Sequence, residues 1–265
     1  MSAVSSEVTG NSGWRFNVLK ATPFIVFLAI WQVLPNLGGL FESYIVPPTG
    51  VVREIFSIAR TGELWSHIRV SFQRALLGFV FATVIAVPLG FIMGGWFRGI
   101  ERTFYPILAF LGKLNPFSLF PLFVMLLGIG EVSKTAIVGW VCLWPLLFRT
   151  ISGVKDIDPT LVKAARGMGC GPIQLFWKVV VPGAIPEIFS GLQMACSTSF
   201  FILVAAEMIG STRGLGFLVW NAQMQFMIPR LFAATVTISA LGLTINWGLR
   251  NVERRLLSWR PPQAI

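Results

Sequence analysis

The stretch from Gly128 to Thr135 has the glycines, the lysine and the hydroxyl groups of a phosphate-binding loop. It reads Gly-Ile-Gly-Glu-Val-Ser-Lys-Thr. A Walker A loop needs a glycine directly before its lysine, and it joins a strand to a helix in a soluble domain. Here Ser133 precedes Lys134, and the stretch lies between two strongly apolar segments. We therefore expect no nucleotide site and no ATPase activity in this chain.

Histidine and cysteine are too few and too scattered for a metal centre or a nucleophilic triad. The one histidine is His67, and the cysteines, Cys142, Cys170 and Cys196, form no Cys-x-x-Cys pair. A zinc site needs about three or four clustered ligands. A triad needs an acidic partner that orients the histidine, and the sequence suggests none for His67. We expect neither a metal site nor catalytic residues.

Lys113 stands out because it lies inside an apolar segment, 104–127, that prolines and Asn115 interrupt. Interrupted helices at membrane depth are tolerated where they line a cavity. A lysine at that depth costs about 2.5–3.5 kcal/mol, so it should face a cavity or an anion. We predict that Lys113, Asn115, Pro116 and Ser118 line a path for a small anionic solute. The alternatives are a kink packed against neighbouring helices and a lysine that snorkels to the membrane surface.

Glu207 lies near the end of another apolar segment, 188–209. As a functional residue it would line the same path, either as a gate or as a contact for a docked protein. The alternative is an interfacial carboxylate that pairs with Arg213 or caps the short helix that follows.

A mostly apolar chain holds these residues. Of its 265 residues, 55% are hydrophobic and 12% are charged, whereas soluble domains carry about 25% charged residues. The net charge of +10 is spread between apolar runs, which does not indicate a nucleic-acid partner. A spanning helix needs about 20 mostly apolar residues. Six segments meet or approach that length: 18–35, 71–96, 104–127, 134–151, 188–209 and 231–249.

If both termini lie in the cytoplasm, the cytoplasmic connectors carry more lysine and arginine than the outer connectors. This bias favours an orientation with both termini inside. Short helices are expected near 50–60 and within 214–226, both on the outer side. The predicted order is a cytoplasmic tail 1–17, a peripheral first span 18–35, an outer connector 36–70, a five-helix core 71–250 and a cytoplasmic tail 251–265.

The cytoplasmic connector 152–187 within this core has an ordered composition for a loop. Helix formers are followed by a glycine-rich turn around Gly169 and Gly171, and then by a second apolar helix that we expect Pro182 to end. The pattern predicts a helix, a sharp turn and a helix on the cytoplasmic side. The alternative is an amphipathic helix that lies on the membrane interface.

This connector reads Lys163-Ala164-Ala165-Arg166-Gly167-Met168-Gly169 and, after nine residues, Val179-Val180-Val181-Pro182. It resembles the "EAA" loop of bacterial ABC-importer permeases, whose pattern is Glu-Ala-Ala, three residues, Gly, nine residues and Ile-x-Leu-Pro. Both alanines, Gly169 and Pro182 match in register. Lys163 replaces the glutamate, which either weakens one contact to the usual partner or marks a partner with a more acidic groove.

The resemblance extends over roughly 40–259 and is greatest to permeases of the nitrate, sulfonate, taurine and bicarbonate type. The supporting stretches lie at 46–49, 62–65, 128–134, 182–186, 205–209, 214–216 and 253–255. Relatives usually carry an arginine and then a proline where this chain has Gly112, Lys113, Leu114 and Asn115, so its basic group is displaced by one residue. This departure leaves the substrate open.

The resemblance implies an all-α integral membrane protein with six transmembrane helices, the type I ABC-importer permease fold and cytoplasmic coupling helices. It implies a multi-pass subunit of the bacterial inner membrane that works by alternating access beside a second permease copy. Two cytoplasmic ATPase subunits would bind ATP and magnesium, so that this chain needs no cofactor, and an extracytoplasmic binding protein would deliver the solute. The implied ATPase interface consists of Lys163, Ala164, Ala165, Arg166, Gly169, Gly171, Ile173, Phe176, Trp177 and Pro182.

Two other classes of membrane protein fit the sequence less well. A secondary transporter or channel that works without ATP predicts inverted repeats, and the sequence shows none. It also leaves the connector 152–187 without a role. A membrane enzyme needs clustered titratable residues within the bilayer, and only Lys113 and Glu207 approach that depth. The importer permease is therefore the preferred interpretation.

Overall fold

The computed structural model describes residues 12–37, 44–96 and 98–256, and within these ranges every regular element is a helix. The π-helical segments are η2 and η3, and η1 is a 3-10 turn. The elements are α1 (Ser12–Val33), η1 (Leu34–Leu37), α3 (Pro48–Arg60), α4 (Glu63–Phe91), η2 (Ile92–Trp96), α5 (Arg98–Gly112), α6 (Pro116–Leu127), α7 (Glu131–Lys155), α8 (Pro159–Gly167), α9 (Pro172–Leu175), η3 (Phe176–Val180), α10 (Val181–Met208), α11 (Leu215–Met224) and α12 (Ile228–Leu256).

Four helical runs in the described residues are long and apolar enough to cross a membrane: Glu63–Gly95, Glu131–Lys155, Pro172–Met208 and Ile228–Leu256. They confirm four of the predicted spans. The predicted span 104–127 is a pair of helices, α5 and α6, bent by 92° at the interruption. The count of six stays a prediction, because α1, over the predicted segment 18–35, is not among these helices.

Helix α7 forms the centre of the bundle and packs between α4 and α10. Of the most apolar 18-residue stretch of α7, 61% is buried, whereas the corresponding share in α12, at the edge of the bundle, is 17%. Small residues allow the close approach: a Cβ at Gly78 of α4 would lie 2.7 Å from Cγ1 of Val138 on α7. Such contacts are typical of membrane bundles, where van der Waals packing rather than water exclusion holds helices together.

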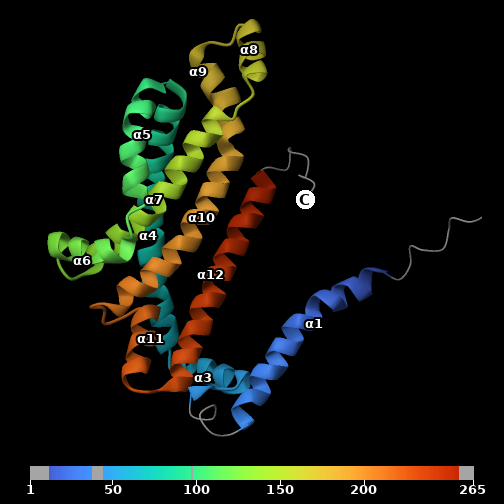
Figure 1. Ribbon diagram of the computed structural model, residues 1–265, viewed down its shortest axis with the longest axis vertical. Coiled ribbons are helices and arrows are strands. Elements are labelled where there is room, and N and C mark those ends of the chain that lie inside the picture. The colour runs from blue at the N-terminus through green and yellow to red at the C-terminus, as the bar shows by residue number, and fades with distance from the viewer. Residues whose placement is uncertain (1–11, 38–43, 97, 257–265) are drawn as a thin grey trace, which may run out of the picture.

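The two ends of the bundle differ (Figure 1). Helices α8 and α9 project at one end, where α12 also finishes, and α3 and α11 lie at the opposite end. Both α3 and α11 were predicted as short connector helices, and the structure confirms them. Helix α1 stands apart and contacts the rest through its C-terminal end, where the Trp31 indole N–H donates to the Val46 carbonyl at 3.1 Å.

Candidate functional site

The projecting helix α8 is closed at both ends by local hydrogen bonds. At its start, the Asp158 carboxylate accepts the Thr160 backbone N–H at 2.8 Å, and this bond holds the pKa of Asp158 below its usual range. At its end, Gly169 has a positive φ of 80°, its N–H donates to the Arg166 carbonyl, and Cys170 N–H donates to the Ala165 carbonyl. This is a Schellman motif, which needs a left-handed residue at Gly169.

Gly171 and Pro182 act differently from what the sequence predicted. Gly171 has an extended backbone that any residue adopts, so the turn depends on Gly169 alone. Pro182 does not end a helix, because Pro172–Met208 is one continuous helical run. The run widens into the π-segment η3 directly before the proline, where Val181 N–H donates to the Phe176 carbonyl. This wider turn accommodates the proline ring and its missing N–H.

Large apolar side chains are exposed on the projecting pair. Met168 and Ile173 are 78% and 74% exposed, Trp177 is 65% exposed, and Leu161 is exposed as well. Of the two adjacent alanines, Ala164 is exposed and Ala165 is buried. The small side chain of Ala164 leaves room for a close approach of another helix, and Ala165 packs within the chain.

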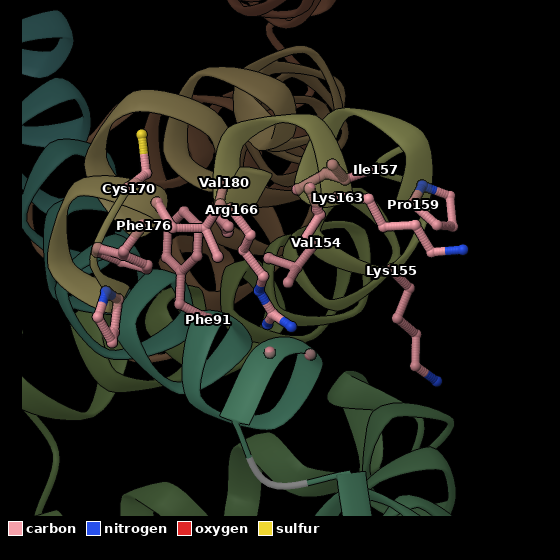
Figure 2. Close-up of a pocket in the computed structure, with 15 residues that line it drawn as sticks. Phe91, Val154, Lys155, Ile157, Pro159, Lys163, Arg166, Cys170, Phe176 and Val180 are labelled. Carbon is pink, nitrogen blue, oxygen red and sulfur yellow. The ribbon is translucent and has the colours of Figure 1, made fainter. Parts of the chain in front are cut away.

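A cavity of about 800 Å³ lies between α8, α9 and the ends of α4 and α7 (Figure 2). Lys163, Arg166 and Phe176 line it together with Phe91, whose ring meets that of Phe176 edge-to-face at 5.3 Å. The Arg166 guanidinium points toward α4, while the ammonium group of Lys163 points away from Phe176. The structure thus brings predicted ATPase-interface residues from α8 and η3 together around one cavity.

The bend between α5 and α6 positions the predicted path residues. The Asn115 side chain accepts the Phe117 N–H at 2.9 Å and so caps α6, and Pro116 takes the first helical position. Lys113 is exposed and, with Pro116, lines a cavity of about 470 Å³. Ser118 is exposed but is not among the residues that line this cavity.

Glu207 is fully buried, so the prediction that it lines the path is corrected in favour of the alternative, a cap of the next helix. Its carboxylate accepts the Gly216 N–H at 2.9 Å, the Ser71 hydroxyl at 2.8 Å and an Arg74 N–H at 2.8 Å. The cap of α11 is the predicted one, but the partner cation is Arg74 and not the Arg213 side chain.

The network around Glu207 includes residues that sequence reasoning missed. Arg74 also holds the Glu131 carboxylate, so the phosphate-loop-like stretch takes part in an ion pair. His67 accepts the Gly214 N–H at 2.9 Å and lies 3.7 Å from Glu63, which corrects the expectation of no acidic neighbour. The available signal was Arg74 itself, an ionisable residue in an apolar run that must be paired.

Comparison with known proteins identifies the family to which this arrangement belongs. Residues 86–258 match the family described as "Binding-protein-dependent transport system inner membrane component". The chain belongs to this family. It is 32% identical over 258 residues to the taurine transport system permease protein TauC of Escherichia coli (strain K12), covering 93% of each chain. It is 31% identical over 247 residues to the putative aliphatic sulfonates transport permease protein SsuC of the same organism, covering 92% and 94%.

The fold comparison agrees with this membership. The chain is similar to a structure of the MetNI methionine ABC transporter in an inward-facing conformation, with a TM-score of 0.60 and 18% identity over 74% of this chain and 95% of that one. At this identity the likeness concerns the fold. The predicted resemblance to taurine and sulfonate permeases is confirmed, and the chain is a membrane-embedded permease subunit of an ABC importer.

Proposed function

We propose that two copies of this chain form the pathway of the importer, with both termini of each copy in the cytoplasm of a bacterial cell. Two ATPase subunits dock on the segment from α8 to η3, and an extracytoplasmic binding protein docks at the end that holds α3 and α11. Closure of the ATPases on ATP and magnesium moves the docked segment and opens the path outward. Family membership supports ATPase and binding-protein partners, and a single path on a two-fold axis suits identical halves.

The observation that carries this proposal is the projecting helix pair (Figure 1), on which large apolar side chains are exposed. Ile173 and Trp177 are exposed in the first turns of the helical run Pro172–Met208, and the turn at Gly169 joins this run to α8. An apolar helix face of this kind fits a groove in a partner protein. In an ATP-independent transporter or channel, the projecting helices α8 and α9 would have no partner to bind, so that alternative is not favoured.

The solute we propose is small and anionic. Lys113 supports this, because it lies at the bend, is exposed to a cavity that Trp140 and Trp144 also line, and forms no ion pair within the described residues. Two of the relatives are named for taurine and aliphatic sulfonates. A sulfonate carries a compact negative charge that an ammonium group at the bend would attract.

A reconstituted complex tests the role of Lys113. Lys113→Leu, assayed with the ATPase subunits, the binding protein and taurine as the probe, should lower taurine-stimulated ATP hydrolysis by about tenfold, because a charge contact of about 1.4 kcal/mol is lost. Lys113→Arg keeps the charge and should retain most of the stimulation. Stimulation that survives Lys113→Leu unchanged would remove the lysine from the path and leave the permease assignment intact.

A further inference from the structure

Two like charges on α8 have no counter-ion within the part of the chain that the structure describes. Lys163 and Arg166 are three residues apart, which places them next to each other on the helix surface. Both are exposed, and neither forms an ion pair there. Their charged groups point in different directions in Figure 2, the Arg166 guanidinium toward α4 and the Lys163 ammonium group away from Phe176, so an anion supplied from outside would stabilise each of them separately.

Two of the nearby acidic residues are already engaged, and a third, Asp156 in the turn before α8, forms no ion pair with either cation in the described residues. Asp158 caps α8 through Thr160 N–H, and Glu101 forms an ion pair with Lys155. The cavity of about 800 Å³ beside the two cations has Lys155 as its third charged lining residue and no carboxylate (Figure 2). The ammonium groups of Lys155 and Lys163 point to the same side of it. Because Lys155 is paired with Glu101, Lys163 and Arg166 are the cations of this cavity that have no ion pair in the described residues, and the cavity has room for a side chain from another molecule.

We propose that Lys163 and Arg166 each receive an aspartate or glutamate of the docked ATPase subunit, and that these contacts select which ATPase the permease accepts. The proposal rests on the docking of the ATPase described above, and it specifies in addition that the groove of the ATPase is acidic. Position 163 holds a lysine in this chain, whereas the loop pattern that the connector resembles has a glutamate there, so the partner's groove should carry the opposite charge from the usual one. An ATPase built to pair with a glutamate would set a cation against Lys163 and be rejected by like-charge repulsion.

The surroundings of the two cations favour a protein over an anionic lipid headgroup. Leu161 and Ile173 are exposed on α8 and α9, the pair that projects at one end of the bundle (Figure 1). Apolar anchors beside a few charges are typical of a protein interface, where the apolar residues supply affinity and the charges supply selectivity.

Binding of the purified cognate ATPase subunit to the full-length permease in nanodiscs tests the proposal. Lys163→Glu should raise the Kd about tenfold and flatten its dependence on salt, because an attraction becomes a repulsion. Arg60→Glu makes the same change of charge on α3, at the opposite end of the molecule, and should leave the Kd unchanged. Exchanging the facing acidic residue of the ATPase for lysine should restore binding to Lys163→Glu.

A second variant separates this proposal from the docking itself. Ile173→Asp removes an apolar anchor and should abolish binding whatever the charge of the groove. Wild-type affinity in Lys163→Glu together with loss of binding in Ile173→Asp would overturn the charge proposal and leave docking intact. Wild-type affinity in both variants would overturn the proposed function as well. A defect of Lys163→Glu that disappears in nanodiscs of neutral lipid would assign the cations to lipid and overturn the proposal.

Discussion

At the scale of single residues, the buried carboxylate of Glu207 has the most demanding surroundings. Its two oxygens together accept hydrogen bonds from Ser71, Arg74 and Gly216 N–H, and no part of its surface is exposed. An ionised group out of water is tolerated only when it is paired and fully hydrogen-bonded. The network joins α4, α10 and α11, so a change at this one residue acts on the end of the bundle that holds α3 and α11.

Glu207→Gln should destabilise the permease by about 3 kcal/mol or more, because the amide turns an N–H₂ donor toward groups that are themselves donors. Glu131→Gln is the matched control: its side chain is 66% exposed, water can replace the lost contact, and the cost should be about 1 kcal/mol or less. Thermal unfolding in one detergent compares the two variants. Equal stability of both would contradict the structural role of Glu207.

Much of the residue-level chemistry could be read from the sequence, but the pairings could not. Lys113 was identified as an ionisable residue in an interrupted apolar segment, and the structure places it at the bend. The partner of Glu207 was missed, because Arg74 lies 133 positions away and only the packing of α4 against α10 brings the two together. A single sequence gives no information on such a contact.

At the scale of elements, apolar runs predicted the spanning helices but not their ends. Helix α4 begins at Glu63, well before the predicted 71, since a helix continues past the apolar part that hydropathy detects. The sequence predicted that Pro182 ends a helix, whereas the π-segment η3 before it allows the helix to continue through the proline. The sharp turn after α8 was predicted correctly, because Gly169 has a backbone conformation that few other residues adopt.

The turn at Gly169 offers a matched pair of substitutions within one element. Gly169→Ala places a Cβ at a φ of 80° and should cost about 1–2 kcal/mol locally, which tilts α9 relative to α8. Gly171→Ala has an extended backbone and no atom within 4 Å of the new Cβ, so it should be neutral. Taurine-stimulated ATP hydrolysis of the reconstituted complex should fall in the first variant only. A loss of the same size in both would refute the role of the turn.

The cap of α8 by Asp158 gives a prediction with a defined pH range. Because the pKa of Asp158 is lowered in the folded chain, the cap stabilises α8 above the unfolded pKa of about 3.9 and is lost as the pH falls through the lower folded value. Between about pH 5 and 8 the cap should therefore not change. Amide exchange of residues 160–167 at pH 7 should speed up in Asp158→Ala and stay near wild type in Asp158→Asn, which keeps the acceptor oxygen. Fast exchange in both would show that the charge matters more than the acceptor.

At the scale of the whole molecule, the two ends of the bundle have different chemistry. One end presents α8 and α9 with exposed apolar and cationic side chains, and the other holds α3, α11 and the ion-pair network of Arg74. This difference between the two ends suits a subunit that contacts an ATPase on one side of a membrane and receives solute on the other. The assignment to transport rests on the family to which the chain belongs, since a fold alone does not determine function.

The most direct test of the central claim is hydrogen–deuterium exchange of the full-length permease in nanodiscs, with and without the cognate ATPase subunit. The account predicts that added ATPase slows exchange in residues 159–180, which comprise α8, the turn 168–171, α9 and η3, and leaves 48–60 and 215–224 unchanged. Protection confined to the end that holds α3 and α11, or no protection at 159–180 under conditions where the complex forms, would contradict it.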